Sequence, residues 1–415
     1  MKRISLFAEN LKPISLLLAA ALAQACSSPP ASTGPTPSVE FKMDVTVPAG
    51  GELHDCKFVT MPAGGDQYVI AAQHMYTPGS HHLLLFRTDL STIPAGGDQI
   101  QDCYEGGGGT IMSHVRGVVY GSQVPQGSFT MPAGVGFKMQ SEEVLLLQVH
   151  YLNAQPNAVD AHVTVGLETI TDAGKIQNLA GVLFYYDPFI DVPPASMAKA
   201  GARCTLPKDI TLQTVFPHYH ARGYGYQAYL DLPSQPPSAM PFYTSTDWEH
   251  PAKWDGGPLA LAAGTKIRFY CDYDNTTGSA EYFQGQSAAT NEMCMFTGMY
   301  YPAMDQASEY CISNFDQFGV GAATCAATSS CIQSCPPGSA PTGLGSASGS
   351  ADVSPCWQKC LVASCPAAST PLFAQLTCIG TNCSAECSGS GSSCTACAIQ
   401  KCPNEVTACQ NAACN

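Results

Sequence analysis

Two histidines one residue apart, His218 and His220, mark the stretch of this chain best suited to chemistry. They lie in TVFPHYHARGYGYQAYL (214–230), a run of β-branched and aromatic residues that predicts a strand. Side chains on a strand alternate between its faces, so His218 and His220 point the same way. Two imidazoles on one face supply half of a metal site, although two separate histidines on a solvated face would give the same pattern.

Further metal-binding side chains occur at three other places. His81 and His82 begin the predicted strand HHLLLF, and His150 ends the predicted strand VLLLQVHY. Adjacent histidines on a regular strand face opposite ways, so His81 and His82 can share one metal only at an irregular strand start or a bulge. Met293 adds a thioether, a soft ligand that favours Cu(I), although methionine is more often core filler in a chain with 13 of them.

Short alternating segments must position these side chains. From Val39 to about Asp172 they are separated by Pro-Ala-Gly turns, and a second series runs from Lys175 to about Tyr310. The pattern predicts an all-β fold of two antiparallel jelly-roll-like β-sandwich domains, residues 39–172 and 173–315. The clearest strands are VEFKMDVTV, QYVIAAQHMY, HHLLLF, RGVVYG, VLLLQVHYL and HVTVGLETI in the first series, and LAGVLFYY, DITLQTVFPHYH, GYQAYL, KIRFYCDY and CMFTGMYY in the second.

The composition narrows the functional class. Only 12% of the 415 residues are charged, and 38 glycines and 31 prolines make the chain rich in turns, as in all-β extracellular proteins. A net charge of −14 argues against nucleic acid or an anionic membrane surface as a partner, because both require a basic surface.

The N-terminus has the pattern of an export signal, residues 1–25. Lys2 and Arg3 precede an apolar run, and Ala23-Gln24-Ala25 has the small-x-small form of a cleavage site. Cys26 follows, with a flexible tether over 26–38. This order predicts a protein that is either secreted or held in a bacterial cell envelope as a lipoprotein acylated on Cys26. No later run reaches the ~18 apolar residues that a membrane span needs.

Without Cys26, 20 of the 21 cysteines remain, which predicts up to ten disulfides in an exported protein. Fourteen of them lie in residues 316–415, a Cys-rich module with a rough internal repeat. Its CxxxC and CxxC spacings would also suit zinc. However, no histidine follows His250, and the compartment is oxidising, so disulfides that staple helical turns or loops are favoured.

Five segments occur in the order and spacing of a known family: GSHHLLLF, MPAGVGFKM, LLLQVHYLN, HYHARGYGYQ and NEMCMFTGMYYP. Together they resemble the copper type II, ascorbate-dependent monooxygenases, which include peptidylglycine α-hydroxylating monooxygenase and dopamine β-monooxygenase. The resemblance covers about Val39 to Phe315. It implies two facing β domains and the hydroxylation of a small-molecule C–H bond with O2 and a one-electron donor such as ascorbate.

The resemblance also implies roles for individual residues. One copper ion would be held by His81, His82 and His150, and a second, oxygen-activating copper by the catalytic set His218, His220 and Met293. Gln148 shares a strand face with His150 and is a candidate to support the ligands. Disulfides are implied between Cys56 and Cys103, Cys204 and Cys311, and Cys271 and Cys294.

Three positions depart from the peptide-amidating members of that family. Their arginine two residues before the HxH pair is Phe216 here, and their asparagine and tyrosine after the Met-Cys pair are Met295 and Thr297. These changes remove or weaken polar anchors for a peptide carboxylate. We therefore expect no peptide amidation, and an apolar or aromatic substrate suits Phe216 and Met295 better.

Two other functions fit part of the pattern. An exported copper-binding or electron-transfer protein could keep the same ligands, but it would have little reason for two chemically different sites. A zinc hydrolase is disfavoured by Met293 and by the lack of a glutamate placed as a general base. The remaining histidines, expected to be structural or surface residues, are His54, His74, His114, His162 and His250.

Overall fold

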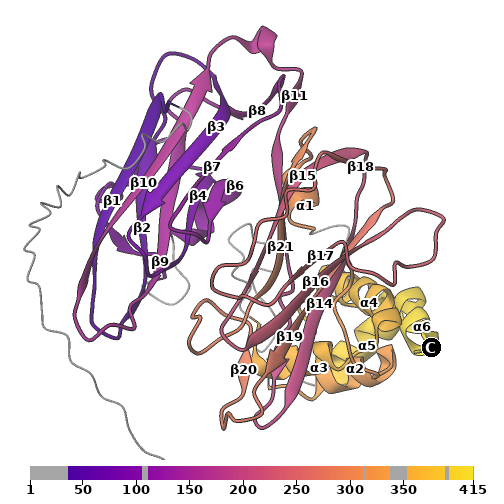
Figure 1. Cartoon of the computed structure of the whole chain (residues 1–415). Coiled ribbons are helices and arrows are strands. Elements are labelled where there is room, and N and C mark those ends of the chain that lie inside the picture. The colour runs from indigo at the N-terminus through magenta and orange to yellow at the C-terminus, as the bar shows by residue number, and fades with distance from the viewer. Residues whose placement is uncertain (1–35, 105–110, 312–314, 337–352, 388–391, 415) are drawn as a thin grey trace, which may run out of the picture. The chain divides into compact units, whose positions relative to one another are not determined.

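The structure of the chain is a computed structural model that describes residues 36–104, 111–311, 315–336, 353–387 and 392–414. The predicted export signal and Cys26 lie outside these residues. The described chain consists mostly of antiparallel β-sheets, followed by a helical C-terminal region rich in disulfides (Figure 1). The fold class expected from alternating strands is confirmed at this level.

Two sheets form the first sheet pair. The β1 sheet contains β1 (Val39–Val47), β10 (Val159–Ile170), β3 (Gln67–Tyr76), β8 (Val135–Met139) and β11 (Asn178–Leu179), with β7 (Gln126–Thr130) also paired to β3. The β9 sheet contains β5 (Gln101–Asp102), β2 (Glu52–Thr60), β9 (Val144–Leu152), β4 (Ser80–Thr88) and β6 (Val115–Ser122). Short 3-10 helices cover Met112–His114 and Ala173–Lys175.

The core of the first sheet pair follows directly from strand periodicity. In β1 buried and exposed residues alternate without a break from Val39 to Val47, so one face of the strand is apolar and the other meets solvent. Its buried residues pack with those of β3, β8 and β10 against Leu83 and Leu85 of β4 and Leu145 and Leu147 of β9. One hydrophobic core therefore joins the two sheets.

β9 differs from β1 because it is buried on both faces. Leu145 and Leu147 face the core between the β1 and β9 sheets, whereas Val144 and Leu146 belong to a second cluster with Phe184 and other residues of the following β region. This double burial explains the continuous apolar run of VLLLQVHYL. It also means that Gln148 and His150, which continue the face of Leu146, point away from the first core.

Two further sheets form the second sheet pair. The β15 sheet contains β12 (Gly181–Tyr186), β21 (Cys294–Tyr301), β15 (Ile210–Tyr219) and β18 (Leu259–Leu261). The β19 sheet contains β17 (Tyr243–Ser245), β16 (Gly223–Asp231), β19 (Lys266–Asp274), β14 (Met197–Thr205) and β22 (Phe315–Gln317). A small ribbon pairs β13 (Asp191–Val192) with β20 (Tyr282–Phe283), and the short helix α1 spans Gln306–Glu309.

The chain changes from the first sheet pair to the second between β11 and β12. β11 lies after residue 172 but pairs in parallel with β8, so the first sheet pair continues to Leu179. β22 crosses residue 315 and pairs with β14. Between the sheets of the second pair, the buried residues include Leu183, Tyr219 and Phe269.

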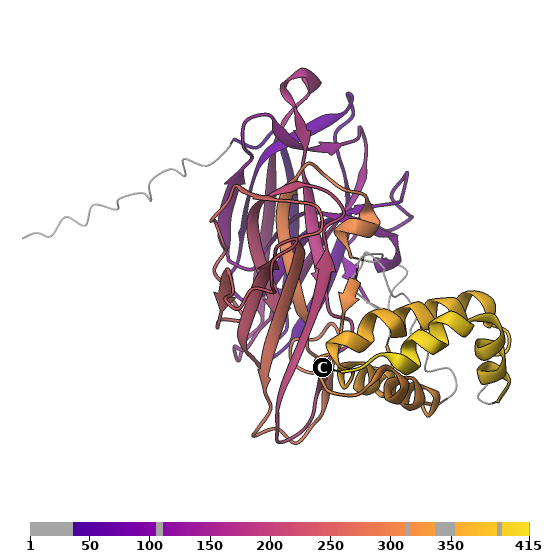
Figure 2. The same cartoon turned by 90° about the vertical axis from the view of Figure 1, so that its right-hand side faces the viewer.

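The C-terminal region consists of α2 (Cys325–Gln333), α3 (Pro355–Val362), a 3-10 turn at Pro366–Ala368, α4 (Ser369–Asn382), α5 (Ser392–Lys401) and α6 (Pro403–Asn411). Figures 1 and 2 both show these helices as one group beside the second sheet pair. Gln358 of α3 secures this contact. Its Oε1 accepts from the backbone N–H groups of Ile190 at 3.1 Å and Gln284 at 2.9 Å, and its Nε2 donates to the carbonyl of Val353 at 2.8 Å.

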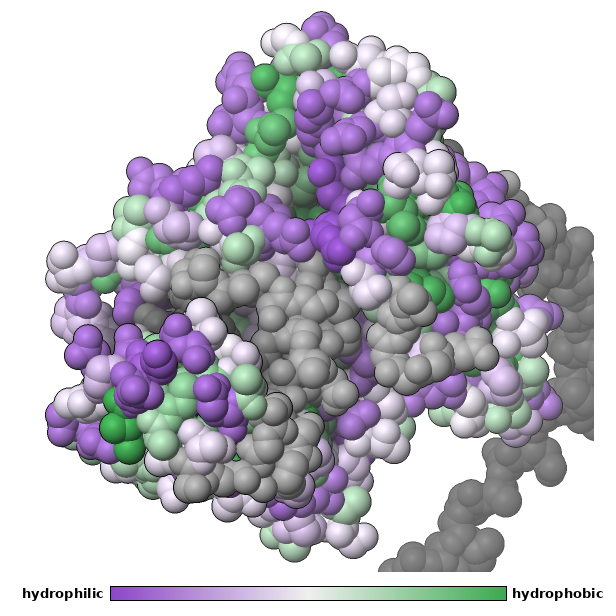
Figure 3. Space-filling model, turned by 180° about the vertical axis from the view of Figure 1, so that it is seen from behind, coloured by the Kyte–Doolittle hydropathy of each residue, from purple (hydrophilic) through white to green (hydrophobic). Residues whose placement is uncertain are grey.

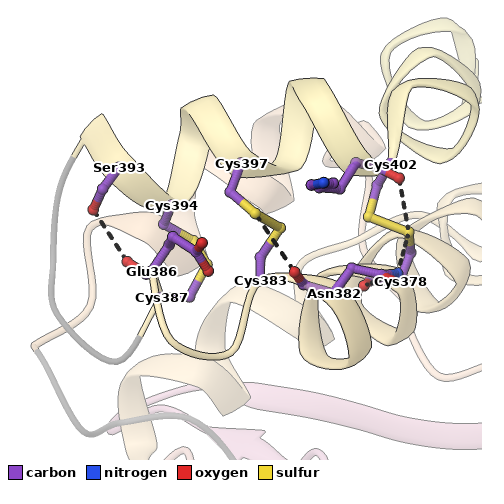
Figure 4. Close-up of a disulfide and its surroundings, with 10 residues drawn as sticks. Cys378, Asn382, Cys383, Glu386, Cys387, Ser393, Cys394, Cys397 and Cys402 are labelled. Carbon is purple, nitrogen blue, oxygen red and sulfur yellow. Dashed lines mark hydrogen bonds between the residues drawn. A yellow bond between two sulfur atoms is a disulfide. The ribbon is translucent and has the colours of Figure 1, made fainter.

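Disulfides hold the helices together. Figure 4 shows three of them as successive links between the segment of α4 and the turn that follows it and the segment of α5 with the residue after it, joining Cys378 to Cys402, Cys383 to Cys397 and Cys387 to Cys394. In the first repeat the two inner links recur between Cys331 and Cys360 and between Cys335 and Cys356. The outer cysteines of that repeat instead bind the last two cysteines of the chain, in the pairs Cys325–Cys409 and Cys365–Cys414. The disulfide interpretation of the tail is thus confirmed, and its thiols are not free to bind zinc.

Ten disulfides indicate an oxidising compartment. Among the described residues, no helix has the length and apolar character to cross a membrane. On the face shown in Figure 3, hydrophilic and hydrophobic residues are interspersed.

Candidate metal centre

A β-bulge places His81 and His82. Ser80 pairs with Tyr151 and His82 pairs with His150, so His81 is an extra residue of β4 between them. The hydroxyl of Ser80 donates to the carbonyls of His82 at 2.9 Å and His150 at 3.0 Å and thereby holds the bulge. The predicted irregularity at this strand start is confirmed. Both imidazoles approach His150, with ring centroids 5.1 Å apart in each case.

The end of β15 places the other two histidines. Tyr219 is buried in the core of the second sheet pair, so His218 and His220 on either side of it face the opposite way. β15 ends at Tyr219, and the N–H of Gly223 donates to the carbonyl of His220 at 2.9 Å in the turn that follows. A Cβ atom at Gly223 would lie 2.2 Å from Cδ2 of Tyr219, so this tight turn requires glycine.

The histidines of the two sheet pairs meet in one histidine cluster, made of His81, His82, His150, His218 and His220. The ring centroid of His81 lies 4.8 Å from that of His218 and 5.5 Å from that of His220, and those of His82 and His218 are 5.0 Å apart. Nitrogen atoms of His81, His218 and His220 all lie within 4.8 Å of one another. The chain therefore contains a buried histidine triad that could hold a metal ion.

This grouping differs from the one that the family resemblance implies. There, His81 belongs with His82 and His150, whereas the triad with ligand atoms within 4.8 Å of one another combines it with His218 and His220 from the other sheet pair. The division of these ligands between two ions stays a prediction, because all five imidazoles are neighbours.

The electrostatics of the cluster suit a metal. No hydrogen-bond partner is present for either nitrogen of His81, for Nδ1 of His82 and His150, or for Nε2 of His220, although these atoms are buried. Burial lowers the pKa of His218 to about 4, and burial next to other imidazoles lowers the pKa of the remaining four well below the ordinary value. Buried, neutral imidazoles with unpaired nitrogens are costly unless a further group binds them, and a metal ion meets that need.

Hydrogen bonds orient two of the imidazoles. Nδ1 of His218 lies 2.8 Å from Oε1 of Gln123, in the loop between β6 and β7. Nδ1 of His220 lies 3.3 Å from the carbonyl oxygen of Asn291. In both cases Nδ1 donates and Nε2 keeps its lone pair, which is the nitrogen available to a metal.

A second polar group adjoins His150. Its Nε2 lies 2.7 Å from Oε1 of Glu52, and the ring of His54 stacks on it with centroids 3.8 Å apart. Glu52 also accepts from the hydroxyl of Ser287 at 2.6 Å and the N–H of Ala288 at 2.8 Å, so it connects the two sheet pairs. Glu52, His54 and His150 form the other candidate metal group with a histidine.

Sequence reasoning missed Glu52, and it gave His54 no more than a structural or surface role, because β2 was not among the predicted strands. The signal was present: Glu52 and His54 are two residues apart and share a strand face. Of the other remaining histidines, His74 is buried and His162 is exposed.

Met293 lies directly before β21, and its side chain is 8% exposed. The next residue, Cys294, forms a disulfide with Cys271 of β19, and the hydroxyl of Tyr273 donates to the carbonyl of Met293 at 2.7 Å. The structure pairs Cys56 with Cys103 and Cys204 with Cys311 as well, which is the pattern that the resemblance implies.

A cavity of about 260 Å³ lies beside the histidine cluster, between the two sheet pairs. Its lining includes His82, His218 and Met293. Gln148, the candidate support for the ligands, lines it too. So do the three residues that differ from the peptide-amidating members of the family: Phe216, Met295 and Thr297. Gln148 lies 3.3 Å from the hydroxyl of Tyr104 rather than hydrogen-bonding to a histidine.

Comparison with known proteins adds no further identification. No protein-family model matches the chain, and no curated protein matches its sequence.

Proposed function

We propose that this chain is a copper-dependent monooxygenase that hydroxylates a C–H bond of a small molecule, with O2 and a one-electron donor such as ascorbate. The observation that carries the proposal is the buried histidine cluster, assembled from both sheet pairs, next to a cavity that also exposes Met293. Imidazole and thioether together are a ligand set that selects copper over zinc, magnesium or calcium.

The ligand sets follow the family resemblance. His81, His82 and His150 would hold one copper and His218, His220 and Met293 the other, and the two sheet pairs correspond to the two jelly-roll-like domains of the family. The unpaired nitrogens of the cluster fit this role. When bound, copper supplies one-electron transfer and the activation of O2, neither of which an amino-acid side chain provides.

The residues of the chain orient the ligands and exclude water. Gln123 and the carbonyl of Asn291 fix the tautomers of His218 and His220, so that Nε2 of each faces inward. The disulfide at Cys294 and the hydroxyl of Tyr273 hold the backbone at Met293. Apolar side chains around the cavity keep bulk water away from the reacting C–H bond.

The overall reaction balances with a two-electron supply. One oxygen atom of O2 is inserted into the substrate C–H bond and becomes the hydroxyl group. The other oxygen atom leaves as water, with two electrons from the donor and two protons. Ascorbate, an enediol, delivers these electrons one at a time.

The sequence pattern and the disulfides also support a proposal about where the protein is located. We propose that the chain is exported and is either secreted or anchored in a bacterial cell envelope through lipid on Cys26. The support is the export pattern before Cys26 and the ten disulfides, which form outside the reducing cytosol.

The compact triad favours a second candidate function, an exported protein that binds copper or transfers electrons without hydroxylating a substrate. His81 and His220 are at most 1% exposed, and a single ion held by them and His218 would be shielded from solvent. Oxygen uptake with ascorbate, coupled to a product that carries one added oxygen atom, separates the two functions, since only the monooxygenase forms such a product.

Anaerobic loading with Cu(I) tests the proposal on the full chain. Wild type should bind two copper ions, and X-ray absorption should show one sulfur ligand. Met293→Ala should lose the sulfur signal and bind one copper more weakly, whereas His150→Ala should weaken the other copper and keep the sulfur signal. Met240→Ala is the matched control, because Met240 is 78% exposed.

Oxygen uptake completes the test. With ascorbate and a substrate, wild type should form a product that carries one atom from ¹⁸O2, and Met293→Ala should not. Identical copper binding and sulfur signal in wild type and Met293→Ala would contradict the assignment, as would protein that takes up one zinc and no copper.

A further inference from the structure

The cavity beside the histidine cluster has mostly apolar walls. Side chains from both sheet pairs form them, among them Phe86 and Phe129 from the first and Phe184, Phe216 and Met295 from the second. Since His82, His218 and Met293 line the same space, a molecule bound there contacts the candidate metal ligands directly. The chemistry of the walls therefore bears on what the site hydroxylates.

Histidines apart, Lys253 is the one charged side chain that lines the cavity within the part of the chain that the structure describes. Its Nζ pairs with Asp255 at 2.9 Å, and its side chain is 34% exposed. Among the described residues that line the space, there is no arginine to bind a carboxylate and no aspartate or glutamate to bind an ammonium group. A charged ligand would be desolvated there without a partner, which is costly.

The polar groups at one end of the cavity are already paired with each other. His74 contacts the hydroxyl of Tyr120 through Nδ1 and the carbonyl of Val124 through Nε2 at 2.7 Å. Because Nε2 must donate to the carbonyl, Nδ1 accepts the hydroxyl proton of Tyr120. This network is satisfied before any ligand binds.

Near the candidate metal ligands, the polar side chains are likewise already hydrogen-bonded to other groups of the protein. The hydroxyl of Thr297 donates to the carbonyl of Phe216 at 2.7 Å. Gln123 accepts from His218 and donates to the carbonyl of Pro217 at 2.6 Å. A ligand with several polar groups would have to break these bonds and leave buried donors unpaired.

We propose that the substrate is an uncharged, largely apolar molecule of about one or two rings, bound by shape and apolar contact. This inference rests on the proposed monooxygenase function and specifies its substrate class. An engineered cavity of about 150 Å³ holds one benzene, so a space of about 260 Å³ suits roughly ten non-hydrogen atoms. The hydroxylated carbon is the one that lies toward His82, His218 and Met293.

Three probes of similar size and different charge test this inference on the copper-loaded full chain: propylbenzene, phenethylammonium and phenylacetate. Binding is measured by calorimetry under anaerobic conditions, and product formation is measured separately with ascorbate and ¹⁸O2. Propylbenzene should bind at least tenfold more tightly than either ion and should yield a monohydroxylated product that contains ¹⁸O.

Two variants report on the cavity itself. Val182→Phe reduces its volume, and Phe216→Arg introduces a cation, so each should weaken propylbenzene binding at least tenfold. Phe216→Arg should also bind phenylacetate more tightly than wild type does. Two variants that act differently keep the test decisive if one of them does not fold.

The outcomes separate the substrate class from the function. Equal or tighter binding and hydroxylation of either ion would overturn the substrate class while supporting the monooxygenase. Preferential binding of propylbenzene without any ¹⁸O product or oxygen uptake would overturn the monooxygenase and, with it, the assignment of a substrate. Propylbenzene binding that neither variant weakens would place the ligand elsewhere and overturn the inference.

Discussion

Nδ1 of His218, on the second sheet pair, lies 2.8 Å from Oε1 of Gln123, on the first. Gln123 also donates to the carbonyl of Pro217, so one side chain holds both the ring and the backbone of the metal-binding strand end. The hydrogen bond makes Nδ1 the protonated nitrogen of His218 and leaves Nε2 free to bind a metal. The orientation of this ligand thus depends on contact between the sheet pairs.

Gln123→Ala should therefore weaken the copper that His218 binds by roughly 10- to 100-fold, as is usual when the partner of a metal-bound histidine is removed. Competition with a Cu(I) chelator measures the change, and Gln123→Glu should recover much of the loss because it keeps an acceptor. Gln126→Ala, at an exposed position of β7, is the control. Unchanged Cu(I) affinity in Gln123→Ala would show that the contact does not support metal binding.

Local periodicity was sufficient to predict several elements to the residue. β1, β3 and β9 coincide with the predicted segments because alternation or a continuous apolar run marks their ends. β2 and β14 were not predicted: ELHDCKFVT carries four charged or titratable side chains on a half-buried strand, and MAKAGARCT is rich in alanine and glycine. Their strand pairing comes from neighbours such as β9 and β19.

For the site, strand periodicity indicated that His218 and His220 share a face, and adjacent histidines indicated a bulge. Neither pattern indicates which surface lies opposite that face. The approach of His81 to His218 depends on packing between sheet pairs, through residues such as Leu146 and Phe184 that are far apart in sequence. This is why Gln123 was not predicted as part of the site.

The disulfide between Cys271 and Cys294 fixes the residue next to Met293. Replacing both cysteines with alanine should lower the free energy of unfolding by about 3 kcal/mol, given a sequence separation of 23. It should also weaken the sulfur-ligated copper, because the backbone at Met293 becomes freer. Denaturant unfolding and Cu(I) competition measure the two effects.

The matched control for that disulfide is Cys387–Cys394, which closes a short loop in the tail. Its double alanine variant should lose stability but bind copper as wild type does. If both double variants keep wild-type copper binding, the disulfide at Cys294 has no role in holding the ligand.

Asp191 should make the stability of the chain pH-dependent. Burial, and after it the nearby carboxylate of Glu281, raise the pKa of Asp191 to about 6, against the opposing charge of Lys359. The folded state therefore holds a proton that the unfolded state loses above about pH 4. The resulting stability is present below about pH 4 and is lost as the pH rises through about 6.

Asp191→Asn removes this ionisation, so the variant should gain stability relative to wild type as the pH increases from 4 to 7. Thermal unfolding of both proteins across this range measures the difference, in which titrating groups that do not interact with Asp191 cancel. Asp98→Asn, at an exposed position, controls for the amide substitution. A difference between Asp191→Asn and wild type that does not change with pH would contradict the raised pKa.

Gln358 should be among the most sensitive positions of the helical tail. Gln358 is 2% exposed, and its Oε1 accepts from the N–H groups of Ile190 and Gln284, next to the ribbon of β13 and β20. Gln358→Ala removes the acceptor that both N–H groups share, at a cost of roughly 1–3 kcal/mol for each hydrogen bond lost. We expect the free energy of unfolding to fall by about 2–4 kcal/mol, measured in denaturant with the disulfides intact. The control is Gln333→Ala, on the exposed side of α2, which should change this free energy by less than about 0.5 kcal/mol. A loss at Gln358 no larger than that at Gln333 would mean that the disulfides alone hold the tail in place.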